Sequence, residues 1–307
     1  MAGSFNIHYI TRDRIDIAKW NTCIDAADNG LIYGYSFYLD HMATLWDGLV
    51  LGDYEAVMPL TWNKKYGIAY LYQPFLTAQL GLFGKNISAE LLGAFLNSIP
   101  SKFKYWDFYL NHGNVFALNN FSLYRRANYV LNLYRSYEDI TGGYRENIIR
   151  NIKKAEQAGC TASKDFDEEK VIELAIEQMN TYSKESKGNV TRFRTLYKYL
   201  YQRQQATTYG IFSPKDELLA SCVFFFSHNR AYYILVGNHP NGRTIGASHA
   251  LIDAFIKDHA GKNMVLDFEG SDIRNLAFFY SSYGAMEENF AGIRLNRLPV
   301  FLRWMKK

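Results

Sequence analysis

Cysteine and proline are scarce in this chain, which has three cysteines and six prolines among 307 residues. Cys23, Cys160 and Cys222 lie far apart, so they form neither a disulfide framework nor the paired spacing of a zinc site. This cysteine usage is typical of a reducing compartment. No apolar run approaches the length of a membrane span, and the N-terminal residues lack the apolar stretch of a signal peptide. We therefore expect a cytoplasmic protein that binds no metal ion.

A strong excess of either charge sign is also missing, because 34 lysine and arginine residues oppose 30 acidic residues. A net charge of +4 is too small for a dedicated nucleic-acid coat or a polybasic membrane anchor. The length favours about two domains. Residues 141–307 hold the positive excess, and the change in charge near Ile140 and Gly143 indicates a domain boundary there.

The two halves share one order of predicted elements: a hairpin, a third strand, a helix and a fourth strand. The first half has strand patterns at 46–51, 56–62, 68–72 and 105–110 and a helix pattern at 88–98. The second half has strand patterns at 207–212, 218–226, 231–236 and 264–268 and helix patterns at 141–158, 168–184, 194–205 and 246–260. The repeat predicts an α/β fold of two tandem domains, 1–140 and 141–307, with mixed and largely antiparallel sheets.

The sharpest local motif is Arg243-Thr-Ile-Gly-Ala-Ser248, which opens the helix of the second copy and is called the donor loop below. Small residues at a helix N-terminus let backbone N–H groups approach an anion, and an arginine binds phosphate bidentately. The motif therefore predicts phosphate binding by Arg243, Gly246, Ala247 and Ser248. The alternative is an ordinary turn in which Gly246 provides a positive φ.

After the donor loop come a strand that ends in Asp267-Phe-Glu-Gly-Ser271 and a helix that contains Asn275 and Tyr280. This order resembles the GNAT superfamily of acyl-CoA N-acyltransferases, in which an Arg/Gln-x-x-Gly-x-Gly/Ala loop binds the cofactor pyrophosphate. The resemblance implies two GNAT-like domains, acyl-CoA as co-substrate on the donor loop, and Tyr280 beside the departing thiolate. Ser248 and Ala285 depart from the family pattern, which has Gly or Ala and Phe at these positions.

A second resemblance covers most of the chain and joins four segments, Tyr72–Pro74, Gln79–Phe83, Arg145–Lys154 and Asp267–Ser271. Together they are similar to the Fem-type (peptidoglycan bridge) aminoacyltransferase group, whose bacterial members add amino acids to cell-wall precursors from aminoacyl-tRNA. The first half has no equivalent of the donor loop between Tyr72 and Phe95, so we interpret the first domain as a degenerate copy that shapes the acceptor pocket. The long heptad segment with which Fem-type enzymes often contact tRNA is missing.

The acceptor-binding candidates that follow are Tyr72, Gln73, Arg150, Lys153 and Asp267. For Arg150 and Lys153 the alternative is a solvated helix face, and for Asp267 it is support of the fold.

Transfer to an amine requires a group that takes up a proton, and a carboxylate suits this role. We assign it to Glu269, which lies just past a strand end, where open α/β sheets place ligands. Tyr280 is the candidate acid for the leaving group. The alternatives are that Glu269 supports the fold and that Tyr280 is a core aromatic.

Three functions remain open at this point. The leading one is N-acyl transfer from a phosphate-bearing carrier, with acyl-CoA favoured, to an amine acceptor. The second is tRNA-dependent, Fem-type aminoacyl transfer to a cell-wall precursor, which the basic and aromatic residues of 182–203 favour. The third is a non-catalytic small-molecule binding module, which the departures at Ser248 and Ala285 favour.

Overall fold

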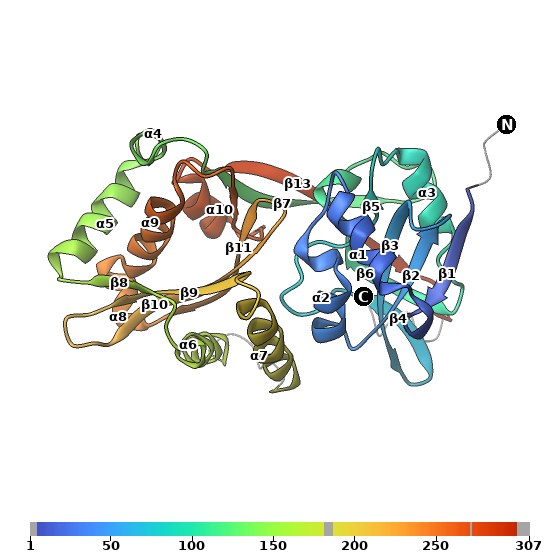
Figure 1. Cartoon of the computed structure of the whole chain (residues 1–307), viewed down its shortest axis with the longest axis horizontal. Helices are drawn as coiled ribbons and strands as arrows, with labels where there is room; N and C mark the ends of the chain where they lie inside the picture. Colours follow the sequence, from blue (N-terminus) through green and yellow to red (C-terminus); the bar gives the residue numbers. More distant parts are fainter. Residues whose placement is uncertain (1–4, 181–186, 271, 300–307) are drawn as a thin grey trace. The chain divides into compact units, whose positions relative to one another are not determined.

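The computed structural model describes residues 5–180, 187–270 and 272–299. The chain divides into two compact units (Figure 1). The first unit combines Met1–Arg126 with Asn289–Lys307, and the second is Ala127–Glu288. The predicted domain boundary near residue 140 therefore lies inside the second unit, and the assignment of domains to 1–140 and 141–307 stays a prediction.

The sheet of the first unit is antiparallel except for one parallel pair, β4 with β6. Its strands follow the order β1 (Ile7–Thr11), β2 (Leu45–Leu51), β3 (Ala56–Lys65), β4 (Ile68–Tyr72), β6 (Phe103–Tyr109) and β13 (Met286–Asn296), and β5 (Phe83–Gly84) pairs with β3. The helices are α1 (Ile17–Ala26), α2 (Ser36–Met42) and α3 (Ala89–Asn97), with 3-10 turns at Arg12–Arg14, Ile32–Gly34 and His112–Asn114.

The sheet of the second unit is also antiparallel except for one parallel pair, β11 with β12. Its strands follow the order β7 (Leu123–Asn132), β12 (Val265–Asp267), β11 (Arg230–Asn238), β10 (Leu218–Ser227), β9 (Ala206–Phe212) and β8 (Thr161–Lys164). The helices are α4 (Tyr137–Thr141), α5 (Glu146–Gln157), α6 (Glu168–Asn180), α7 (Lys187–Tyr201), α8 (Pro240–Ile245), α9 (Ala247–His259) and α10 (Arg274–Ser281). Helices α6 and α7 cover one face of this sheet, and α5, α9 and α10 lie on the other (Figure 1).

The predicted order of hairpin, strand, helix and strand is present in both units, within a residue or two for most elements. Two strands that lacked a clear sequence pattern decide where the units divide. Strand β7 follows β6 in the chain but pairs with β12, and β13 follows β12 but pairs with β6. Strand β7 thus follows the elements of the first unit in the sequence but completes the sheet of the second, and β13 follows the elements of the second unit but completes the sheet of the first. The helix predicted at 194–205 also starts earlier, at Lys187, and ends at Tyr201.

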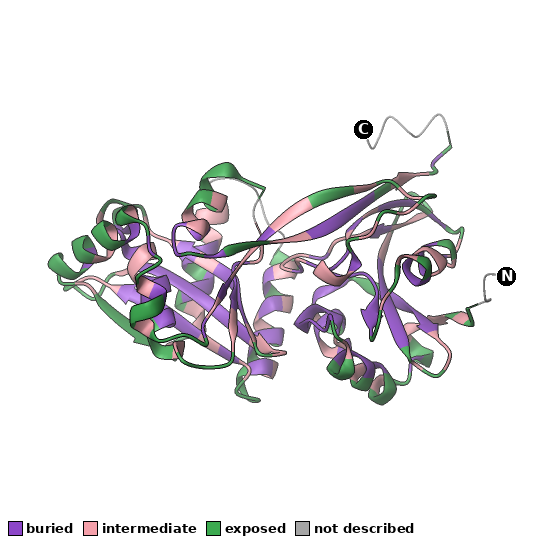
Figure 2. Cartoon of the chain, turned by 90° about the horizontal axis from the view of Figure 1, so that it is seen from above, coloured by how far each residue is buried: buried purple, intermediate pink, exposed green. Residues whose placement is uncertain are grey.

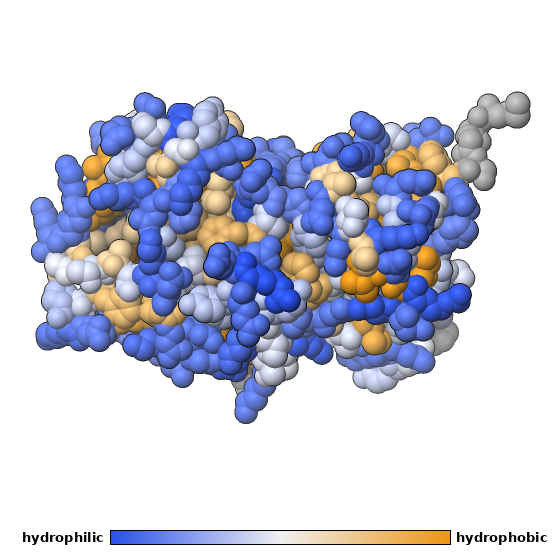
Figure 3. Space-filling view, viewed as in Figure 1, coloured by the Kyte–Doolittle hydropathy of each residue, from blue (hydrophilic) through white to orange (hydrophobic). Residues whose placement is uncertain are grey.

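Apolar spacing explains how α9 packs on the sheet of the second unit. Leu251, Phe255 and Ile256 recur at helical spacing and are fully or almost fully buried. The Phe255 ring stacks on Phe224 of β10, with ring centroids 3.7 Å apart. Burying one such side chain contributes about 2–3 kcal/mol. Buried residues accordingly line the strands and the inner helix faces (Figure 2). Figure 3 shows patches of hydrophobic residues among hydrophilic ones on the visible face of the second unit, at the left of the view.

Candidate functional site

One cleft of the second unit is lined by Tyr280 and by Arg243, Gly246 and Ser248 of the donor loop, whereas the predicted binding residue Ala247 is fully buried and does not line it. Its volume is about 430 Å³, which is within the range of small-molecule sites. Strand β11, the turn between α8 and α9, and helix α10 form its walls. Two hollows in the first unit are larger, about 600 and 640 Å³, but no candidate residue of the sequence analysis lines either of them.

The floor of the cleft is a strand edge that lacks a pairing strand. Strand β11 pairs with β12 only from Arg230 to Tyr232, where β12 ends at Asp267. Beyond Tyr232, β11 continues to Asn238, and on this side it has no strand partner within the described ranges. Backbone N–H and C=O groups on an open strand edge can bind an extended chain that contains amides.

Gly246 has a structural reason to be glycine. It ends α8 and precedes α9 with φ of +80°, a conformation that favours glycine. A Cβ atom at this position would also lie 2.4 Å from the carbonyl oxygen of Asn151 on α5. The close approach of α5 therefore requires glycine here, whether or not a ligand binds.

The start of α9 nevertheless opens on the cleft. No side chain caps this helix, because glycine is the residue before it, and the first N–H groups of a helix have no partner within the helix. The partial positive charge of such a helix start favours an anion. The Ser248 hydroxyl donates a hydrogen bond to the side chain of Asn238 and so ties α9 to the end of β11. Serine at this position thus has a structural role that Gly or Ala lacks.

Tyr280 and Glu269 lie near each other in the second unit. The Tyr280 ring stacks on Phe268, with centroids 4.5 Å apart, and the residue is 8% exposed. Burial and, secondarily, the negative charge of Glu269 raise the pKa of the Tyr280 hydroxyl above its ordinary value, so the hydroxyl keeps its proton at neutral pH. Glu269 has a left-handed backbone, with φ of +63°, which is rare for a residue other than glycine and often marks a functional turn.

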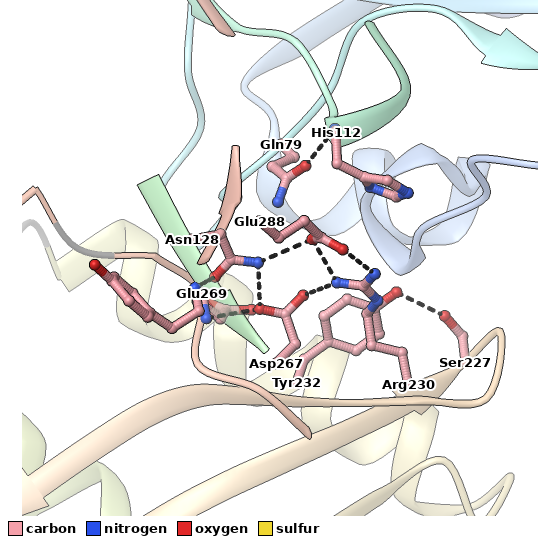
Figure 4. A network of polar contacts seen from close by, with 10 residues as sticks. Gln79, His112, Asn128, Ser227, Arg230, Tyr232, Asp267, Glu269 and Glu288 are labelled. Atoms are coloured by element: carbon pink, nitrogen blue, oxygen red, sulfur yellow. Dashed lines mark hydrogen bonds and ion pairs between the residues drawn. The ribbon is translucent and has the colours of Figure 1, made fainter. Parts of the chain in front are cut away.

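Asp267 belongs to a buried polar network (Figure 4). Its carboxylate accepts hydrogen bonds from the Arg230 guanidinium at 2.7 Å, the Asn128 amide at 2.9 Å and the Glu269 backbone N–H at 2.8 Å. The Arg230 guanidinium also binds both carboxylate oxygens of Glu288 at 2.9 Å. Burial alone would lower the pKa of Arg230, but the charges of Asp267 and Glu288 outweigh it and raise that pKa. Asp267 therefore holds the turn that carries Glu269.

None of the five acceptor-binding candidates is among the residues that line the cleft, and neither is Glu269, so their roles stay predictions. In the first unit, the Gln73 amide accepts from the Tyr109 N–H at 2.9 Å and donates to the Thr77 carbonyl at 2.6 Å. The Tyr72 hydroxyl accepts from the Thr44 N–H at 2.8 Å. Arg150 and Lys153 are exposed along one side of α5.

The basic and aromatic segment is partly structural. In α7, Phe193 and Tyr197 are buried, and Arg194 forms an ion pair with Glu169 at 2.8 Å. Arg203 lies over the Tyr199 ring at 3.6 Å. Residues 181–186 of this segment are outside the described residues.

Two residues of the polar network around Asp267 were missed by the sequence analysis. Asn128 and Glu288 lie on β7 and β13, whose apolar patterns are weak, so nothing in the sequence brings them to Asp267. His249 directly follows the donor loop, and the structure places it among the residues that line the cleft.

Comparison with known proteins finds neither a matching family model nor a matching curated sequence. Solved structures do match. FemX is 12% identical with a TM-score of 0.66, over 98% of this chain and 100% of FemX. L-PGS from Bacillus licheniformis is 13% identical with a TM-score of 0.52, over 85% of this chain and 87% of that chain. Saccharomyces cerevisiae N-myristoyltransferase with bound myristoyl-CoA is 10% identical with a TM-score of 0.51, over 96% of this chain and 80% of that chain.

At these identities the likeness establishes the fold alone. The chain has a mixed α/β fold, as the sequence order predicted, and this fold is similar to those of FemX, L-PGS and N-myristoyltransferase. None of the helices within the described ranges is long and apolar enough to cross a membrane. In the same ranges no group of three or more His, Cys, Asp or Glu side chains is placed to hold a metal ion.

Proposed function

We propose that this protein is an N-acyltransferase of two GNAT-like domains that moves an acyl group from acyl-CoA to an amine acceptor. One observation carries the proposal: the open edge of β11, the donor loop and Tyr280 line a single cleft. In this arrangement the donor's phosphates lie at the start of α9 and Arg243. Its amide-containing arm runs along β11 toward Tyr280. The myristoyl-CoA bound by the yeast structural neighbour is consistent with such a donor.

The reaction is a direct transfer in a ternary complex. The acceptor nitrogen attacks the thioester carbonyl carbon, a C–N bond forms and the C–S bond breaks. The nitrogen loses one proton to Glu269, directly or through a water molecule, and the departing thiolate gains one proton from Tyr280. The Tyr280 hydroxyl is protonated at neutral pH, so it holds a proton that it can donate.

A test of the proton acceptor is the Glu269→Gln variant. We expect transfer to slow by about 100-fold or more with CoA affinity unchanged, because only the proton-accepting group is lost. Circular dichroism checks that the fold is intact. An unchanged transfer rate would remove Glu269 from the mechanism.

The second candidate is tRNA-dependent aminoacyl transfer to a cell-wall precursor, favoured by the exposed basic residues of α7 and by a fold shared with FemX over nearly the whole chain. Filter binding of tRNA across salt concentrations separates the two donors. If the chain contacts many tRNA phosphates, its affinity for tRNA should fall steeply as the salt concentration rises. If the chain uses acyl-CoA instead, we expect only weak, nonspecific binding of tRNA. Specific tRNA binding without CoA binding would replace acyl-CoA by aminoacyl-tRNA as donor.

A further inference from the structure

His249 occupies a fixed position in the cleft that the proposed chemistry leaves without a role. It is the third residue of α9, and its ring packs edge-on against Phe279 with centroids 4.9 Å apart. Its backbone is held as well: the N–H donates to the Gly246 carbonyl at 3.0 Å, and the carbonyl accepts from the Tyr283 hydroxyl at 3.2 Å. The imidazole is therefore preorganised at the cleft wall.

The two ring nitrogens have different surroundings. Nδ1 is enclosed and has no hydrogen-bond partner in the described part of the chain. Nε2 is consequently the polar ring atom that a ligand in the cleft can meet. A neutral imidazole carries one N–H, and an enclosed, unpaired N–H is rarer in proteins than an enclosed acceptor, so the proton belongs on Nε2.

The ring is uncharged at neutral pH, because burial lowers the pKa of His249 to about 4. Its neighbour Phe279 precedes Tyr280 on α10, and all three residues line the cleft. An uncharged donor beside aromatic side chains suits a neutral carbonyl acceptor. Phosphate is better served by the charge of Arg243 and the start of α9.

We propose that the Nε2–H group of His249 donates a hydrogen bond to a carbonyl oxygen in the amide-containing arm of the donor. His249 is then a positioning residue that sets how deeply the donor enters the cleft. The inference rests on the proposed function, since it takes acyl-CoA as the donor.

Two variants separate the N–H group from the ring. His249→Phe keeps an aromatic ring against Phe279 and loses the donor, whereas His249→Gln loses the ring and keeps an N–H at a similar distance. His259→Phe is the matched control, because His259 stacks on Phe255 at the other end of α9, with centroids 4.1 Å apart, and lines no part of the cleft. Thermal unfolding of each variant confirms that it folds.

Calorimetric titration with CoA and with ADP, which lacks the arm, tests the assignment. We expect His249→Phe to weaken CoA binding about 3- to 10-fold, the value of one neutral hydrogen bond, with ADP binding unchanged. His249→Gln and His259→Phe should bind CoA within about twofold of the parent. Equal CoA affinity in His249→Phe and the parent overturns the role of His249 alone, as does an equal loss of ADP affinity. A parent chain that fails to bind CoA overturns the proposed donor, and the inference with it.

Discussion

Replacing Arg230 by methionine leaves the carboxylates of Asp267 and Glu288 in the second unit without their positively charged partner. The Arg230 side chain is 12% exposed, and it binds Asp267, 1% exposed, and Glu288, 20% exposed. Removing one partner of a buried ion pair costs about 3–5 kcal/mol, because the remaining charge is left uncompensated. Two carboxylates share this arginine, so we expect the upper part of that range for Arg230→Met.

Urea unfolding followed by circular dichroism measures the loss as a lower midpoint at an unchanged slope. The control is Lys19→Met, which removes an ion pair to Asp53 whose side chains are 48% and 74% exposed, and its midpoint should not move. A triple variant that adds Asp267→Asn and Glu288→Gln to Arg230→Met removes the two uncompensated negative charges. It should therefore be more stable than Arg230→Met alone. A midpoint of Arg230→Met equal to that of the parent would refute the reasoning, and so would a triple variant no more stable than Arg230→Met.

Three further predictions concern the cleft. In urea unfolding, Gly246→Ala should destabilise the chain by about 1–3 kcal/mol more than Gly261→Ala. Both glycines have φ near +80°, but of the two only a Cβ atom at Gly246 would meet a backbone oxygen. Equal losses of stability in the two variants would contradict this. Tyr280→Phe keeps the stack on Phe268 and should slow acyl transfer about 100-fold without lowering the melting temperature, and an unchanged rate excludes Tyr280 as the acid. Below pH 6.5 the unfolded chain binds a proton at His249, whereas the folded chain does not bind it until about pH 4. The stability of the folded chain therefore decreases as the pH is lowered through that window. His249→Gln should reduce the fall between pH 7 and pH 5 by about 1 kcal/mol, after allowance for the partly exposed ring, and an identical fall removes His249 as its source.

The two units differ at the strand edges beyond their parallel pairs, β4 with β6 and β11 with β12. In the first unit, the Gln73 side chain bonds to β6 beyond the end of β4, and Leu80 continues the pairing with Leu110. In the second unit, β11 lines the cleft, and beyond Tyr232 it has no strand partner on this side within the described ranges, although the Asn238 N–H bonds to the Gln178 side chain. An edge satisfied from within the chain leaves no backbone groups for a donor. This difference is consistent with the proposed donor site in the second unit.

Local pattern was sufficient for most of the elements and for the fold class. Short runs rich in apolar residues between turn residues marked the strands that became β2 to β4 and β9 to β11, and helical spacing marked α3 and α9. These signals depend on side chains a few residues apart, so they can be read along the chain. The donor loop and Tyr280 were found in the same way, because loop, strand and helix follow one another within forty residues.

Tertiary structure alone decided which strands meet and what each polar group contacts. The exchange of β7 and β13 joins residues more than 130 positions apart, and it brings Asn128 and Glu288 to the Asp267 carboxylate. Strand pairing over such separations depends on backbone hydrogen bonds, which any residue except proline can form, so composition carries little information about the partner. The enclosed Nδ1 of His249 and the contact that requires glycine at position 246 likewise arise from packing between α5, α9 and α10.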